Sequence, residues 1–129
     1  GDLDNALIAY NKSLELIPNG KTPLQNIPVV YEIKKDYTKA IDAYKKLLTY
    51  YPEDAEAYYG MGRIGIIYTD DLEAGTDYMC KAYNIYVKTL SPYRSDAQTN
   101  LSVAYRKMKE KGKEDVFFRI LKDNNISTK

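Results

Sequence analysis

Two adjacent carboxylates and one thiol are the residues of this chain that could do covalent chemistry. Asp70 and Asp71 could form a hydrolase pair or hold a metal ion, and Cys80 could act as a nucleophile. The 129 residues include no histidine and a single cysteine. Cys–His and Ser–His–Asp catalysis, structural zinc sites and an internal disulfide are therefore excluded.

The positions of these groups favour structural roles. Asp71 stands directly before an apolar helical stripe, where a carboxylate typically accepts backbone N–H groups and caps the helix. Cys80 falls in mid-helix with no histidine to activate it, which is typical of a small buried hydrophobic residue. We therefore expect a protein that is not an enzyme and that has no cofactor and no metal site.

The charge balance argues against a nucleic-acid binder. Nineteen basic residues against eighteen acidic ones give a net charge of +1. The segment 106–129 is locally basic, but Glu110, Glu114 and Asp115 interrupt it. This favours a solvated helix end, with an acidic partner as the alternative.

The composition also limits how the chain relates to a membrane. The hydrophobic fraction of 44% is enough for a folded core. No run of eighteen apolar residues is present, so no membrane span is expected. The sequence begins at Gly1, which indicates a processed or recombinant fragment from which an export signal could have been removed. A cytoplasmic and a periplasmic location both stay open.

An internal repeat organises the chain. When residues 1–18 are laid over 35–52, a shift of 34, about one identity is expected from ordinary composition. Seven occur: Asp2/Asp36, Ala6/Ala40, Ala9/Ala43, Tyr10/Tyr44, Lys12/Lys46, Leu14/Leu48 and Pro18/Pro52. Both segments have apolar residues at helical spacing. The pattern predicts two equivalent amphipathic helices, each with an aspartate cap (Asp2, Asp36) and a terminating proline (Pro18, Pro52).

Other helices follow from the same spacing. Residues 20–35 and 54–69 preserve the shift of 34, and Thr22 before Pro23 resembles a helix start. Pro28 predicts a kink, or a helix that begins only near Ile27. The third copy aligns at a shift of 35, which indicates one extra residue near 66–70 and a helix that runs to about Leu90. Two further helices are expected at 96–108 and 114–122, separated by Gly112.

These residues resemble the tetratricopeptide repeat, whose signature is W-x2-L-G-x2-Y, then an alanine, an aromatic residue four positions later and a closing proline. First-helix and second-helix versions of this pattern cover residues 1 to about 106: Leu24-x2-Ile27-Pro28-x2-Tyr31, Tyr58-x2-Met61-Gly62, Gln98-x2-Leu101-Ser102-x2-Tyr105, Ala6-x3-Tyr10, Ala40-x3-Tyr44 and Gly75-x3-Met79. Gly65 departs from the pattern, which has a large residue there, and Tyr68 is expected to compensate.

The resemblance implies an all-α fold, an α-α superhelix. This is a right-handed solenoid of antiparallel helix hairpins with about seven helices. A single domain over 1–123 is expected, divided into an orphan second helix (1–18), a repeat (20–52), a second repeat (54–90), and a divergent repeat with a capping helix (93–123). Residues 124–129 are expected to be frayed.

The resemblance also implies a function, the binding of a peptide or partner segment in the concave groove formed by the first helices. Ten residues occupy the positions expected to face this groove: Gln25, Asn26, Val29, Tyr59, Arg63, Ile66, Thr99, Asn100, Val103 and Arg106. Tyr59 breaks the apolar phase of its helix, so binding and packing roles stay equally open. The chaperone-binding clamp of some family members is not expected, because only its asparagine, at Asn100, is present.

A structural role is the alternative. The helix at 1–18 has no first helix before it in this sequence, and its apolar stripe would then attract a partner. A second copy of the chain could supply that partner, which would make the protein a homodimer or scaffold fragment.

Overall fold

The computed structural model describes residues 1–127, and this part of the chain contains seven α-helices, one π-helical segment and no β-strand. The elements, in chain order, are α1 (Asp2–Leu16), α2 (Lys21–Ile33), α3 (Tyr37–Tyr50), α4 (Ala55–Arg63), η1 (Ile64–Tyr68), α5 (Leu72–Lys88), α6 (Arg94–Glu110) and α7 (Glu114–Asp123). The contacts group the described residues into two compact units, Gly1–Ala57 and a second unit that begins at Tyr58.

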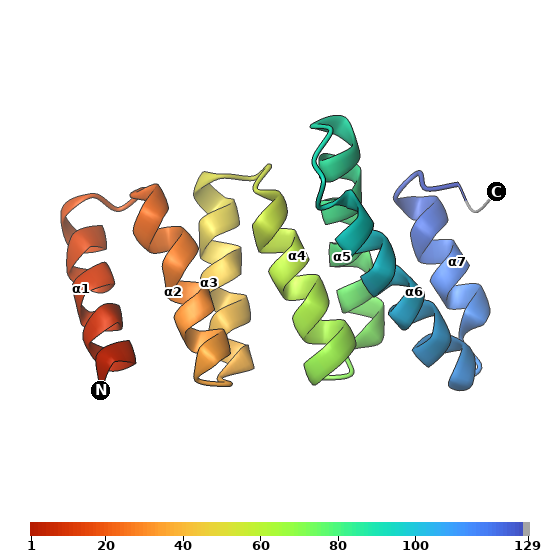
Figure 1. Ribbon diagram of the computed structural model, residues 1–129, viewed down its shortest axis with the longest axis horizontal. Coiled ribbons are helices and arrows are strands. Elements are labelled where there is room, and N and C mark those ends of the chain that lie inside the picture. The colour runs from red at the N-terminus through yellow and green to blue at the C-terminus, as the bar shows by residue number, and fades with distance from the viewer. Residues whose placement is uncertain (128–129) are drawn as a thin grey trace. The chain divides into compact units, whose positions relative to one another are not determined.

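The first unit consists of α1, α2, α3 and the start of α4. Figure 1 shows α1, α2 and α3 as neighbouring rods, joined by short turns. Apolar side chains from all three helices are buried: Leu14, Leu24, Ile27, Val30, Ala40, Tyr44 and Leu47. This is the helix-hairpin packing that the repeat pattern predicts.

Three of the predicted helix boundaries in this unit are confirmed and two are wrong. The Asp36 carboxylate accepts a hydrogen bond from the Lys39 backbone N–H at 3.2 Å, so Asp36 caps α3 as expected. Asp2 does not cap α1, because the helix already begins at Asp2 and Gly1 is its N-cap. Nor is Thr22 a cap, since α2 begins one residue earlier with Gly20 in that position. The terminating prolines follow helices that end at Leu16 and Tyr50.

Pro28 does not delay the start of α2. The helix runs from Lys21 to Ile33 with Pro28 inside it, so the expectation of a start near Ile27 is wrong. Pro28 and its neighbours Leu24 and Ile27 are buried. We infer that this packing offsets the backbone hydrogen bond that an interior proline removes.

The extra residue of the third copy lies in the second unit. After Arg63 the helix widens into the π-helical segment η1, whose closing bond runs from the Thr69 N–H to the Ile64 carbonyl at 3.0 Å. Such a bond spans five residues instead of four, so a π-turn absorbs one inserted residue without breaking the helix. The sequence expectation of one insertion near 66–70 thus has a structural counterpart at 64–68.

Gly65 allows two backbones to approach closely, whereas the repeat pattern has a large side chain at this position. A Cβ atom added to Gly65 would lie 2.8 Å from both the Asp71 carbonyl oxygen and the Gly75 Cα. A Cβ on Gly75 would similarly meet the Ile66 nitrogen at 2.9 Å. The backbones of η1 and α5 therefore touch here, and only glycine permits it. Tyr68 does not compensate inside the core, because its side chain is 51% exposed.

The rest of the second unit packs α5 against α6 and α7. Its core includes buried side chains from all three helices: Leu72, Met79, Ala82, Tyr86, Ala97, Leu101, Ala104, Met108, Phe117 and Leu121. Helix α5 ends at Lys88, two residues before the predicted Leu90. Gly112 separates α6 from α7 as predicted, with a φ of +71°. Of the tyrosines at the repeat positions, Tyr44 is buried, and Tyr10, Tyr31, Tyr58 and Tyr105 are half-buried.

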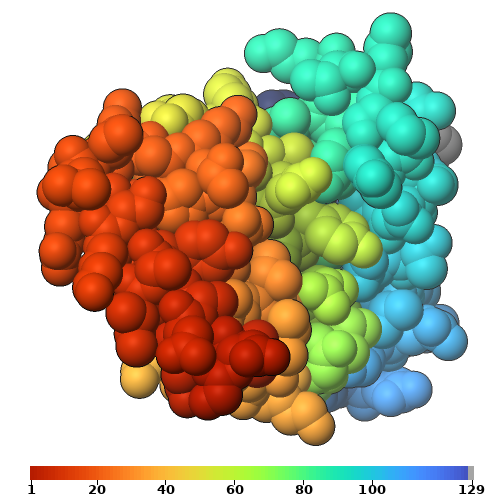
Figure 2. Space-filling view, turned by 60° about the vertical axis from the view of Figure 1, so that its left-hand side comes forward, coloured from red at the N-terminus to blue at the C-terminus, as the bar shows by residue number. Residues whose placement is uncertain are grey.

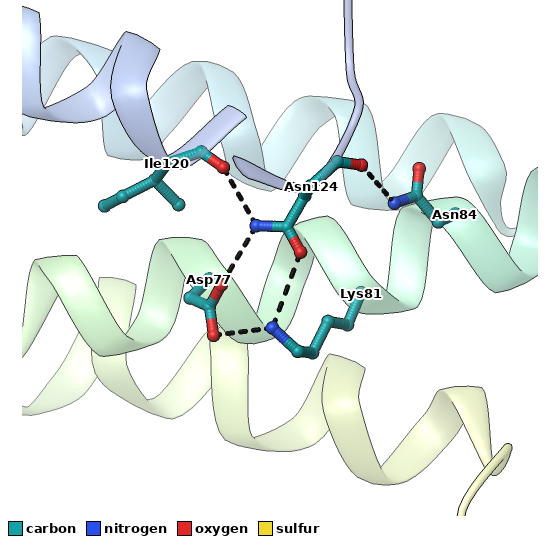
Figure 3. A network of polar contacts seen from close by, with 5 residues as sticks. All are labelled: Asp77, Lys81, Asn84, Ile120 and Asn124. Carbon is teal, nitrogen blue, oxygen red and sulfur yellow. Dashed lines mark hydrogen bonds and ion pairs between the residues drawn. The ribbon is translucent and has the colours of Figure 1, made fainter. Parts of the chain in front are cut away.

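The end of α7 is anchored by Asn124, as Figure 3 shows. The Asn124 amide donates to an Asp77 carboxylate oxygen and to the Ile120 carbonyl, both at 2.9 Å, and its backbone carbonyl accepts from the Asn84 amide at 2.7 Å. Lys81 pairs with Asp77 at 2.8 Å. Asn124, the first residue of the segment expected to be frayed, is thus held by hydrogen bonds to α5 and α7. Residues 128 and 129, also included in that expectation, lie outside the described part of the chain.

Candidate functional site

Helices α4 and α6 run parallel within the second unit. The Asn100 amide of α6 donates to the Tyr59 hydroxyl of α4 at 3.1 Å, and the Lys107 ammonium of α6 donates to the Ile66 carbonyl of η1 at 2.7 Å. Both contacts join residues 41 positions apart, so the two helices keep one register along this face. The sequence-predicted residues Tyr59 and Asn100 are thus brought into direct contact.

An aromatic cluster supports Tyr59. Its ring lies 6.3 Å from that of Tyr86, which in turn lies 6.0 Å from that of Tyr93. Tyr86 is buried, Tyr59 is half-buried and Tyr93 is 56% exposed, so the cluster extends from the core to solvent. Tilted ring pairs at these separations stabilise one another and hold the Tyr59 ring in place. The sequence pattern did not indicate a role for Tyr86 and Tyr93, although both lie near the turn before α6.

Asn100 is oriented by its own helix. Its amide group donates to the Asp96 carbonyl at 3.0 Å as well as to Tyr59, which uses both amide protons. The amide oxygen is thereby left as an acceptor.

The Thr99 hydroxyl donates back to the Ser95 carbonyl at 3.1 Å, while Val103 is half-buried on the same helix. Arg63, one turn after Tyr59 on α4, is half-buried.

The remaining predicted residues of the first unit lie on α2. The Gln25 amide donates to one carboxylate oxygen of Asp54 at 3.1 Å, while the other accepts the Ala57 backbone N–H at 3.1 Å. Gln25 therefore braces the residue that caps α4. Asn26 is half-buried, and Val29 is 45% exposed.

Ile66 is not a groove residue, and this part of the prediction is wrong. Its side chain is fully buried, with an exposed fraction of 0%. The π-turn explains the difference, because the additional residue rotates the positions that follow it around the helix axis. The neighbouring Ile67 is 40% exposed instead.

Arg106 lines a different surface feature, a cleft of about 660 Å³ between α6 and α7. The walls of this cleft are mainly apolar and aromatic, and the residues that line it are Tyr83, Gln98, Leu101, Ser102, Tyr105, Arg106, Phe117, Phe118, Leu121, Ile126 and Ser127. The sequence pattern did not predict this cleft, although Phe117, Phe118 and Leu121 have the spacing of one helix face.

The groups suited to covalent chemistry have structural surroundings. Asp70 is exposed and pairs with Lys111 at 3.1 Å and with Lys107 at 3.9 Å. Asp71 occupies the N-cap position of α5, but its side chain makes no capping hydrogen bond, so the expected capping contact is absent. Burial raises the pKa of the Cys80 thiol to about 12, and the thiol is fully buried as predicted.

Neither a metal cluster nor a membrane-spanning helix occurs in the described part of the chain. Among residues 1–127, no group of three or more histidine, cysteine, aspartate or glutamate side chains could hold a metal ion. Over the same range, no helix has the length and apolar character needed to cross a bilayer.

Comparisons with known proteins agree with this architecture. A crystal structure of MamA superposes with a TM-score of 0.59 and 21% sequence identity, covering 96% of this chain and 87% of that one. No curated relative matches the sequence. The structural match identifies the class of protein, an all-α superhelical fold of helix hairpins.

One family model matches part of the sequence. Residues 25–54, which span α2 and α3, match the family described as Tetratricopeptide repeat. The chain therefore contains a tetratricopeptide repeat, and the resemblance predicted from its motifs is confirmed. The family and the fold support a protein–protein interaction module in general.

Proposed function

We propose that this protein is a non-catalytic module that binds an extended peptide segment of a partner protein, and that the Tyr59–Asn100 pair is central to the binding surface. The observation that carries the proposal is the direct contact between these two side chains from successive first helices. Each fixes the other, so little side-chain entropy remains to be lost on binding.

The chemistry of the pair suits a peptide backbone. The Asn100 amide oxygen can accept a peptide N–H, because both amide protons are already used. The Tyr59 ring offers a rigid face for an apolar or proline side chain. Val103 adds apolar surface one turn along α6. Gln25, Asn26, Val29, Arg63, Thr99 and Arg106 stay predicted contributors.

Selection from a random peptide library tests the proposal, because it requires no identified partner. The library would be displayed on phage and selected against the whole chain, and the enriched peptides would then be measured by calorimetry. We expect Tyr59→Ala and Asn100→Ala each to weaken binding by about tenfold or more, the range of an interface hot spot.

Matched substitutions on another helix provide the control. Lys45→Ala and Thr49→Ala change exposed side chains of α3, and they should leave the affinity unchanged. Circular dichroism would establish that all four variants keep their helicity. Selected peptides that bind the Tyr59 and Asn100 variants as tightly as the wild-type chain would refute the assignment.

Self-association stays the second candidate, and exposed apolar residues near the N-terminus favour it. Ile8, Leu16 and Ile17 are 54%, 84% and 59% exposed. Sedimentation velocity over a range of concentrations decides the question, because a dimer would dissociate on dilution. A species of 14.8 kDa at every concentration would eliminate this candidate.

A further inference from the structure

Leu90 combines a strained backbone with an uncovered side chain. Five described residues that follow helix ends have a positive φ: Lys35, Asp70, Leu90, Gly112 and Asn125. Four of them are polar or glycine, and Leu90 is the only apolar member. Its φ is 56° and its side chain is 85% exposed. A leucine in the left-handed backbone conformation lowers the stability of the fold. Because the Leu90 side chain is exposed, its burial does not offset this cost.

The strain is imposed by the turn that ends α5. The Ser91 N–H donates to the Tyr86 carbonyl at 2.8 Å, and the Leu90 N–H donates to the Val87 carbonyl at 3.2 Å. These bonds close the helix in the pattern that normally has glycine at the left-handed position. Glycine would therefore serve the fold better than leucine. Residues with a strained backbone often lie at functional sites. A contact between the Leu90 side chain and a binding partner would explain why leucine occupies this position.

Residues 87–94, named here the α5–α6 tip, project from the second unit. Figure 1 shows the turn between α5 and α6 reaching beyond the end of α7, and Figure 2 shows the same segment as a protruding knob. Three apolar or aromatic side chains are exposed on it, Leu90 together with Val87 at 37% and Tyr93 at 56%. The tip is therefore a convex apolar surface.

Cations bracket the apolar side chains of the tip. Lys88 and Arg94 are both exposed, and neither forms an ion pair within residues 1–127. No aspartate or glutamate occurs between Asn84 and Ser95. The tip therefore carries a local charge of +2 from these two side chains, in a protein whose net charge is only +1.

We propose that the α5–α6 tip docks on an anionic lipid bilayer surface. Leu90 and Val87 insert below the headgroups, while Tyr93 lies at the interface, where tyrosine is enriched. Lys88 and Arg94 contact the lipid phosphates from either side. The charge of the tip selects an anionic surface. A bilayer also accepts a convex apolar tip without a shaped pocket.

Vesicle co-sedimentation tests this proposal on the whole chain. Vesicles of phosphatidylcholine mixed with phosphatidylglycerol should bind the protein at low salt, and vesicles of phosphatidylcholine alone should bind it more weakly. Leu90→Gly should lower the partition coefficient by about tenfold, because the inserted leucine is lost. The same variant should raise the melting temperature, because glycine relieves the left-handed strain.

Lys35→Gly is the matched control for the backbone. It relieves the same kind of strain at the end of α2, where φ is 60°, and should raise the melting temperature without changing vesicle binding. Leu16→Gly controls for the side chain, because Leu16 is 84% exposed on another helix and should not affect the partition coefficient.

The charges are tested separately. Lys88→Gln and Arg94→Gln should each lower binding to the anionic vesicles by about fivefold. Lys45→Gln and Lys46→Gln on α3 are the matched exposed controls and should have no comparable effect. The proposal is overturned if the wild-type chain binds neither kind of vesicle, or if Leu90→Gly binds as well as the wild-type chain.

Discussion

The Lys107 ammonium of α6 donates a 2.7 Å hydrogen bond to the backbone carbonyl of Ile66 in the last turn of η1. Carbonyls in the last turn of a helix have no partner within it. A lysine from the neighbouring first helix thus completes the end of the π-turn. The inserted residue is accommodated by two features, a wider turn and a side chain that closes it.

Replacement of Lys107 by methionine should weaken the fold. Lys107→Met keeps most of the aliphatic stem but leaves the Ile66 carbonyl without this donor. We expect a loss of about 1 kcal/mol in the free energy of unfolding, measured by urea titration. Lys45→Met, on the exposed surface of α3, should change it far less. Equal effects of the two substitutions would show that the hydrogen bond contributes nothing.

Addition of one methyl group at Gly65 should be costly. The new Cβ would lie 2.8 Å from backbone atoms of Asp71 and Gly75, which no side-chain rotation relieves. Gly65→Ala should therefore lower the free energy of unfolding by about 2–3 kcal/mol or more. Gly112→Ala is a useful comparison, because its Cβ meets no atom within 4 Å and only the positive φ of +71° opposes it. A smaller loss at Gly65 than at Gly112 would contradict the close approach of the helices.

Protonation of Asp77 at acid pH should lower the free energy of unfolding, because Asp77 accepts the hydrogen bond that holds the end of α7. Burial raises the pKa of this carboxyl group, but the hydrogen bond from Asn124 and the nearby Lys81 together hold it below the ordinary 3.8. A lowered folded-state pKa gives stability that is present above about pH 4 and lost as the pH falls through the folded value. Asp77→Asn should therefore be less stable than wild type at about pH 6, with the difference shrinking at about pH 2.

The Asp77 prediction is measured by urea midpoints at the two pH values. Asp115→Asn, at an exposed position of α7, is measured in parallel for comparison. Asn124→Ala should weaken α7 at neutral pH and reduce the effect of Asp77→Asn in the double variant, since the two residues share a hydrogen bond. Additive losses would mean that the two side chains act independently.

The Cys80 thiol should be unreactive in the folded protein. Its pKa of about 12 leaves about one thiol in ten thousand ionised at pH 8, and the side chain has no exposed surface. Reaction with a disulfide reagent should accelerate steeply as urea unfolds the chain, and the absorbance of the released thiolate would record it. Fast labelling of the native protein would show that the second unit opens readily.

The sequence by itself determined the repeat pattern, the helices and much of their extent. The shift of 34, the apolar stripes and the terminating prolines carried this information, because helix periodicity and proline chemistry act over a few residues. The one-residue insertion near 66–70 was also visible as a change of register. Asp36 as a cap and Cys80 as a buried residue followed from the same local rules.

Tertiary structure decided which side chains meet and which are covered. The π-turn rotates Ile66 so that its side chain is buried in the core. No local sequence pattern distinguishes a π-turn from an insertion in a loop. The contact between Tyr59 and Asn100, the backbone approach at Gly65 and the anchoring of Asn124 each join elements far apart in sequence. Such contacts depend on how helices cross and in which register, and that geometry results from the packing of the whole unit.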